Sequence, residues 1–302
     1  MNNVIFKGVY SALFSLYDEH LNVKKDSVKK LINYNLENGI NGFYVGGGTG
    51  ECYVLPNRIR KQMLETVKEY APDSTPIIAH VGSGHLEDVE DLISHANSVG
   101  VDAISSLPPS LTSYYTAEET IAYYKHIAAL SKVPVMAYVT PILKGEPVSF
   151  TRQLMAIDNV IGIKLTIPNY YVFEQIKRIN SGNINLLNGP DECMLAGLSV
   201  GADGAIGTTY NLLPGTSSQI YECYKQGKME EALKLQNEMN RFIDVMLQYR
   251  TKYNIAGWKS ILTRLDIDPG HTLAPISKPT DSQINEIFIS LEANGLPREF
   301  RN

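Results

Sequence analysis

Short apolar segments alternate with longer amphipathic segments over residues 1–227 of the chain. The apolar segments are 8–14, 42–47, 76–82, 102–107, 133–139, 160–166, 184–189 and 204–210, and their length and composition are typical of buried strands. Apolar residues that recur every three or four positions predict helices over 27–39, 57–71, 86–100, 116–130 and 169–180. Gly39 and Gly100 stand where these helices should end, in the position that C-caps favour.

The order of these elements indicates the fold. Strands that alternate with helices pair in parallel through βαβ crossovers. Eight such units match a closed (β/α)8 TIM barrel, which we predict, with a doubly wound open sheet as the alternative.

A different pattern begins at Lys228. Residues 228–250, a stretch through Trp258 to Leu265, and residues 282–295 all predict helices without intervening strands. Residues 267–280 are rich in Pro and Gly and predict a loop. We therefore expect a barrel over 1–227 that carries the active site, and a helical extension over 228–302 that packs on it.

Composition narrows the function. The chain has 302 residues, a formal charge of -5 and a pI of about 5.7, with no basic stripe, so we expect neither nucleic-acid nor membrane-surface binding. The three cysteines, Cys52, Cys193 and Cys223, show no CxxC pair, which argues against a disulfide framework or a zinc site. No apolar run reaches the ~18 residues of a membrane span, so we expect a cytoplasmic protein whose partners are small molecules and copies of itself.

Reactive residues gather where the predicted strands end. In a TIM barrel the carboxyl ends of all strands meet at one mouth, where active sites lie. The sequences that reach this mouth are GGGTGE after the second strand, Tyr138 in the fifth, Lys164 and Thr166 in the sixth, NGPDE after the seventh and GTTYN after the eighth. The clustering predicts an active site there.

Lys164 is the strongest catalytic candidate. Burial disfavours the charged form of a lysine, so its amine becomes a nucleophile that can capture a carbonyl carbon. Strand alternation predicts that Lys164 and Thr166 point into the barrel, with Gly162 leaving space beneath the amine, while Ile161, Ile163 and Leu165 face the helices. The alternative is a strand-end lysine that reaches solvent or pairs with an acid.

Alternation also orients the fifth strand. Met136 and Tyr138 should point inward and Val135, Ala137 and Val139 outward, so Tyr138 and Lys164 are expected to meet.

Other candidates allow two interpretations each. The glycine-rich stretch with Thr49 can present backbone amides to a carboxylate or form an ordinary turn, and it lacks both Walker and dinucleotide spacing. Asp191 and Glu192 suit either polyol binding or helix capping, and Thr208 either ligand binding or backbone contact. His80 and His85 lack a third ligand, so we expect no metal site.

Together, YVGGGTGE (44–51), AYVTPILKG (137–145), GIKLT (162–166), LNGPDE and GADGAIGTTYN resemble the N-acetylneuraminate lyase group of the dihydrodipicolinate synthase superfamily. The resemblance implies a TIM-barrel class I aldolase, without a cofactor, that cleaves a sialic acid through a covalent Schiff base between Lys164 and the pyruvate portion. It also implies proton transfer by Tyr138 and a homotetramer. By the same resemblance, the substrate-binding residues are Gly48, Thr49, Thr166, Gly189, Asp191, Glu192 and Thr208.

The substrate is expected to be a sugar acid. Related enzymes that act on a dicarboxylate carry an arginine just after the catalytic tyrosine, and residues 139–145 hold none. Asp191 and Glu192 would accept hydrogen bonds from hydroxyls and repel a second carboxylate.

The sequence departs from the lyase pattern at several positions. Gly48 and Thr208 stand where serines are usual, Ser15 would be the relay hydroxyl near the lysine, and Leu111 occupies the slot of a tyrosine that crosses between subunits. Tyr114 or Tyr115 are possible substitutes for that tyrosine. The departures leave two other hypotheses: an aldolase for another 2-keto-3-deoxy sugar acid, and a noncatalytic binding protein on the same scaffold.

Overall fold

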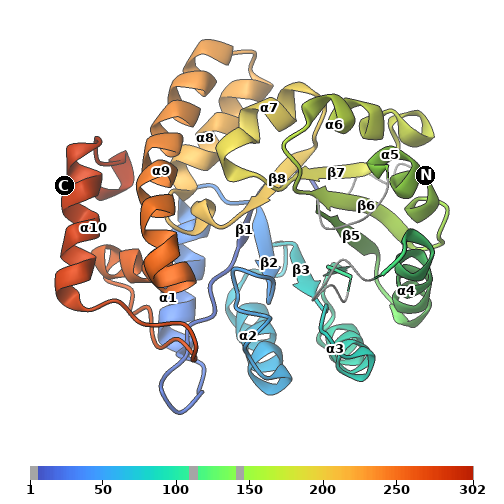
Figure 1. The fold of residues 1–302 in the computed structure, drawn as a ribbon, viewed down its shortest axis with the longest axis horizontal. Coiled ribbons are helices and arrows are strands. Elements are labelled where there is room, and N and C mark those ends of the chain that lie inside the picture. The colour runs from blue at the N-terminus through green and yellow to red at the C-terminus, as the bar shows by residue number, and fades with distance from the viewer. Residues whose placement is uncertain (1–5, 109–114, 141–145, 302) are drawn as a thin grey trace.

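The computed structural model describes residues 6–108, 115–140 and 146–301, and in them eight parallel strands close into a barrel (Figure 1). Each strand pairs with its neighbours in chain order, and β1 also pairs with β8. The predicted TIM barrel is therefore confirmed, and the open sheet is wrong. The strands are β1 (Gly8–Ala12), β2 (Gly42–Val45), β3 (Ile77–His80), β4 (Ala103–Ser106), β5 (Val135–Val139), β6 (Val160–Leu165), β7 (Asn185–Asn188) and β8 (Gly204–Gly207).

Helices cover the outside of the barrel (Figure 1). They are α1 (Lys25–Glu37), α2 (Asn57–Tyr70), α3 (Leu86–Val99), α4 (Ala117–Leu130), α5 (Pro147–Leu154), α6 (Tyr170–Lys177), α7 (Met194–Ser199) and α8 (Pro214–Lys225). The two glycines predicted at the C-terminal ends of helices are confirmed. Gly39 and Gly100 have φ angles of 91° and 72°, in the left-handed region that a side chain disfavours, and the N–H of Gly100 donates to the carbonyl of Ala96.

The hydrophobic core has two layers. Inside the barrel, Tyr10, Tyr44, Met136, Leu187 and Ile206 belong to one cluster of buried side chains. Between strands and helices a larger cluster includes the outward residues of β5, which are Val135, Ala137 and Val139. The predicted alternation of β5 is therefore confirmed.

The predicted alternation of β6 is wrong at Ile161. Val135 pairs with Val160, but the next residue, Met136, pairs with Gly162, so Ile161 is an extra residue in β6. Such a bulge reverses the alternation of side chains along a strand. Ile161 accordingly packs with the cluster inside the barrel. Ile163 and Leu165 face the helices as predicted.

Gly162 has a structural constraint that the sequence did not predict. A Cβ atom on this residue would lie 2.0 Å from the backbone oxygen of Asn185 on the neighbouring β7. Glycine is needed at this position because two backbones approach closely.

The residues after 228 form a helical layer beside the barrel. α9 (Met229–Ser260) packs along α8 and leads through a short 3₁₀ helix (Ile261–Leu265) and an irregular loop to α10 (Asp281–Ala293). Figure 1 shows α10 at the outer edge, with α9 between it and the barrel. The two helical stretches predicted before residue 265 are both present: α9 is interrupted at Asn254, where φ is 46° and ψ is -135°, outside the helical region. Within the described residues, no helix has the length and apolar character that crossing a membrane requires.

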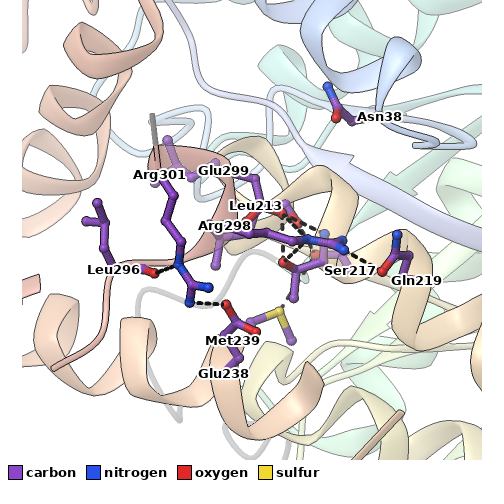
Figure 2. Close-up of polar contacts among 12 residues, drawn as sticks. Asn38, Leu213, Ser217, Gln219, Glu238, Met239, Leu296, Arg298, Glu299 and Arg301 are labelled. Carbon is purple, nitrogen blue, oxygen red and sulfur yellow. Dashed lines mark hydrogen bonds and ion pairs between the residues drawn. The ribbon is translucent and has the colours of Figure 1, made fainter. Parts of the chain in front are cut away.

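The C-terminal segment is tied to α8 and α9 by polar contacts (Figure 2). Glu299 Oε1 accepts hydrogen bonds from the backbone N–H and the hydroxyl of Thr216 at 2.6 and 2.7 Å. Arg301 pairs with Glu238 of α9 at 2.9 Å. Thr216 lies in the first turn of α8. Glu299 therefore places a negative charge at the N-terminus of this helix, where the helix dipole favours it.

We expect Glu299→Ala to lower the free energy of unfolding by about 1–2 kcal/mol, because two donors at the start of α8 lose their acceptor. Urea denaturation measures the change. Glu292→Ala, at an exposed position of α10, is the control and should change stability by less than about 0.5 kcal/mol. Equal losses in both variants would contradict a capping role for Glu299.

Candidate active site

Lys164 lies buried on β6, with 6% of its surface exposed. Its Nζ atom is 4.4 Å from the ring centre of Tyr138 and 4.9 Å from that of Tyr44. Tyr138 is the residue paired with Lys164 across β5 and β6, so the predicted meeting of the two side chains is confirmed. Among the described residues no carboxylate forms an ion pair with Lys164, and the side chain is buried rather than extended into solvent as the alternative required.

The two tyrosines beside the amine are fixed by different contacts. The backbone N–H of Tyr138 donates to the Tyr124 hydroxyl at 3.3 Å, and that hydroxyl donates to the carbonyl of Ser106 at 2.7 Å. The Tyr44 hydroxyl donates to Ser105 Oγ at 3.1 Å, and burial raises the pKa of Tyr44 well above its usual value. The phenol of Tyr44 therefore remains neutral, and its ring packs beside the Lys164 amine.

A cavity of about 550 Å³ opens at the carboxyl ends of the strands. Thr166 connects it to the amine site, because its hydroxyl lies 3.5 Å from the Tyr138 hydroxyl. All seven residues that the sequence predicted for substrate binding line this cavity: Gly48, Thr49, Thr166, Gly189, Asp191, Glu192 and Thr208.

The loop after β2 forms one wall of the cavity. Thr49 Oγ1 lies 2.6 Å from Thr208 Oγ1, so a hydrogen bond joins this loop to the one after β8. Gly48 is open toward the cavity, since a Cβ atom there would meet only Tyr53 Cε2 at 3.8 Å. Ser15 donates its hydroxyl hydrogen to the carbonyl of Gly50 at 2.9 Å. The Ser15 hydroxyl therefore supports the loop.

The acidic pair lines another wall of the cavity. Asp191 Oδ2 accepts a hydrogen bond from the backbone N–H of Thr209 at 2.7 Å, so it satisfies a donor in the neighbouring loop. Burial raises the pKa of Asp191 to about 6. Glu192 is exposed. Gln236 and Asn240 of α9 donate to the backbone carbonyls of Asp191 and Glu192 at 3.1 and 3.0 Å.

His80 has a structural role. Its Nε2 accepts from the N–H of Leu107 at 3.2 Å, which leaves the proton on Nδ1, 3.1 Å from the carbonyl of Gly46. Burial and the nearby Arg60 guanidinium lower the pKa of His80 to about 3, so the ring stays neutral. In the part of the chain that the structure describes, no group of His, Cys, Asp and Glu side chains could hold a metal ion.

Some predicted positions lie outside the described residues. These are Leu111, Tyr114 and residues 141–145. Tyr115 is described and is 45% exposed.

The dihydrodipicolinate synthetase family model matches residues 5–293 of the chain. The protein belongs to this family. N-acetylneuraminate lyase 2 of Escherichia coli is 36% identical over 264 residues, which cover 87% of this chain and 85% of the relative. The N-acetylneuraminate lyase of Citrobacter koseri is 31% identical over 285 residues, with 94% and 93% covered. The predicted resemblance is thus confirmed.

Solved structures agree with this assignment. CdNal from Clostridium difficile, in complex with mannosamine, is 28% identical with a TM-score of 0.88, and the match covers 96% of this chain and 100% of that one. The sialic acid aldolase of Ruminococcus gnavus is 29% identical with a TM-score of 0.87, and the match covers 96% of this chain and 97% of that one.

Sequence reasoning missed the apolar residues that line the cavity. Ile243, Leu247, Ile255 and Trp258 of α9 line the cavity together with Asn254 at the kink. The only sequence signal was that apolar residues of α9 recur at helical spacing, which packing against α8 explains equally well. Tyr44 was visible in its motif, but its place beside the amine depends on the pairing of the strands.

Two glycines of the cavity should respond differently to the same substitution. A Cβ atom at Gly189 would lie 1.8 Å from Thr166 Oγ1, whereas Gly48 has open space. We expect Gly189→Ala to lower the free energy of unfolding by about 1–3 kcal/mol, and Gly48→Ala by less than about 0.5 kcal/mol. Denaturant unfolding of both variants checks this. A tolerated Gly189→Ala would show that Thr166 can move aside.

Proposed function

We propose that this protein is a class I aldolase that reversibly cleaves N-acetylneuraminate, a sialic acid, into N-acetylmannosamine and pyruvate. The observation that carries the proposal is the buried Lys164 amine, held between Tyr44 and Tyr138 next to a cavity with an acidic pair. Relatives that are 31–36% identical are named N-acetylneuraminate lyases. The Ruminococcus gnavus sialic acid aldolase has also been solved as a catalytic lysine mutant, which supports a lysine-dependent reaction.

Lys164 would open the reaction as a nucleophile. Its amine adds to the C2 carbonyl of the substrate, loss of water gives an imine, and protonation of the imine nitrogen gives an iminium ion. The iminium then accepts the electron pair of the C3–C4 bond as that bond breaks, which gives an enamine on C2 and C3. This scheme needs no metal or separate cofactor, because the protonated imine is itself the electron sink. The Lys164 Nζ atom lies against the rings of Tyr138 and Tyr44, and among the described residues no carboxylate pairs with it.

Tyr138 would move the protons. Cleavage of the C3–C4 bond turns the C4 hydroxyl into an aldehyde, so the hydroxyl proton must leave, and the Tyr138 phenol is the group beside the amine that can relay it. The enamine then takes a proton at C3, and water hydrolyses the resulting imine. This last step releases pyruvate and restores Lys164.

The two walls of the cavity would bind opposite ends of the substrate. Thr49 and the amides around Gly48 suit the carboxylate, and Tyr138 would help to hold it. Thr166, Gly189 and Thr208 together with the acidic pair suit the polyol. Asp191 and Glu192 accept hydrogen bonds from hydroxyls and oppose a second carboxylate, which favours a sugar acid over a dicarboxylate.

A second candidate is an aldolase for another 2-keto-3-deoxy sugar acid. Gly48 favours it, because the space at this position is open where related lyases place a serine. A carboxylate pocket that lacks this hydroxyl can accept a different acid or a different placement of the same one.

We expect purified enzyme to release pyruvate from N-acetylneuraminate, with kcat/KM above that for other 2-keto-3-deoxy sugar acids, and borohydride with pyruvate to alkylate Lys164. Lys164→Met should lower kcat/KM by more than about 1000-fold, because the nucleophile is lost. Lys125→Met, at an exposed position of α4, is the control. A higher kcat/KM for another 2-keto-3-deoxy sugar acid would select the second candidate. If borohydride traps no pyruvate on the wild-type enzyme, both aldolase candidates are excluded.

The acidic pair predicts a pH effect on binding. The carboxyl group of Asp191 has a pKa of about 6, so it is charged above this pH and neutral below it. As the pH falls below 6, the KM for N-acetylneuraminate should rise, by up to about tenfold per pH unit, because a charged acceptor for hydroxyls is lost. Trapping of pyruvate, which has no polyol, should not depend on this group. Asp191→Asn should remove the rise, and its persistence in that variant would assign it to another group.

A further inference from the structure

Three buried side chains meet behind the loop after β2 and take no part in the chemistry above. Glu51 lies in the middle of this loop, with its side chain 0% exposed. Its Oε1 accepts a hydrogen bond from Lys259 Nζ at 2.8 Å, and its Oε2 accepts one from the Tyr17 hydroxyl at 2.6 Å. Lys259 lies on α9, 208 residues along the chain from Glu51. The cluster thus joins the helical extension to the loop that faces the cavity.

Lys259 and Tyr17 make further contacts in this cluster besides those to Glu51. Lys259 Nζ also donates to the carbonyl of His271 at 2.8 Å and lies 4.6 Å from the centre of the Tyr17 ring. The Tyr17 hydroxyl accepts from the N–H of Leu273 at 3.1 Å. A buried ion pair with this many contacts resists any movement of one partner alone, because separation would leave a charge without compensation.

Glu51 also has a backbone that needs support. Its φ angle is 63°, in the left-handed region that residues with a side chain rarely adopt. The turn begins where the Glu51 N–H donates to the carbonyl of Gly48 at 3.0 Å, and the next turn begins where Val54 and Leu55 donate to the Glu51 carbonyl, each at 3.0 Å. A strained conformation of this kind persists where the surroundings fix it, and here the fixed side chain does so.

The geometry points to Lys259 and Glu51 as positioning residues for the substrate carboxylate, an assignment that rests on the proposed aldolase function. The ion pair holds the left-handed turn at Glu51, and this turn sets the direction of the amides and hydroxyl at Gly48 and Thr49. The helical extension is then part of the carboxylate pocket, although Lys259 and Glu51 do not touch the substrate.

The test compares two ketones that differ only in the group this pocket binds. Pyruvate carries a carboxylate, and pyruvamide replaces it with a neutral amide. Both can form a Schiff base with Lys164 that borohydride traps. For Lys259→Met we expect the pyruvate concentration that gives half-maximal trapping to rise about 10- to 100-fold, since an ångström of misplacement is enough for such a loss. The value for pyruvamide should change less than about threefold, and kcat with N-acetylneuraminate should fall much less than KM rises.

Controls separate positioning from general damage. Lys278→Met makes the same change at an exposed lysine that lines the same 500 Å³ cavity as Lys259 and makes no contact with Glu51 that the described residues show. It should trap both ketones as the wild type does. If Lys259→Met weakens the trapping of both ketones to the same extent, the proposal is overturned in favour of a purely structural role. Unchanged trapping of pyruvate would also overturn it.

A second variant covers the case in which Lys259→Met does not fold. Glu51→Gln combined with Lys259→Met removes both charges, and replacing a buried pair by neutral groups is often tolerated. The double variant should fold and still lose pyruvate trapping selectively, because the turn no longer has its ionic anchor. Wild-type affinity for pyruvate in this variant would overturn the proposal. Failure of the wild type to trap pyruvate would instead refute the proposed function.

Discussion

Closure of the barrel between β1 and β8 is the constraint on which the site depends. The two strands approach so closely that a Cβ atom on Gly204 would lie 2.0 Å from the carbonyl oxygen of Gly8. Glycine at position 204 permits this approach, and the ring of parallel strands closes. Closure brings the loops after β2 and β8 together, so Thr49 and Thr208 reach hydrogen-bond distance although they are 159 residues apart.

The catalytic candidate depends on an irregularity within this regular ring. The extra residue Ile161 shifts the pairing of β6, and from Gly162 onward the strand pairs so that Lys164 lies opposite Tyr138. The rings of Tyr138 and Tyr44 lie beside the Lys164 amine, and among the described residues no carboxylate pairs with it. The closely packed barrel holds these side chains in place.

The helical extension acts on the site at three places. Gln236 and Asn240 hold the backbone of the acidic pair, Trp258 lines the cavity, and Lys259 pairs with Glu51 behind the loop after β2. Gln236 and Asn240 precede the break in α9 at Asn254, and Trp258 and Lys259 follow it. The cavity and the loop after β2 are therefore supported by a segment that contributes no strand to the barrel.

The sequence by itself determined the barrel, the helical tail and the residues at the mouth, because periodicity and strand ends are local properties and the motifs retain their order along the chain. Alternation along the strands also pointed Lys164 and Tyr138 into the barrel, although their pairing depends on the shifted register of β6. Only the tertiary structure decided that Ile161 packs inside the barrel, that Gly162 serves a close backbone contact, and that Lys259 pairs with Glu51. These features depend on which atoms meet across distant segments, and neither composition nor spacing encodes the register that brings them together.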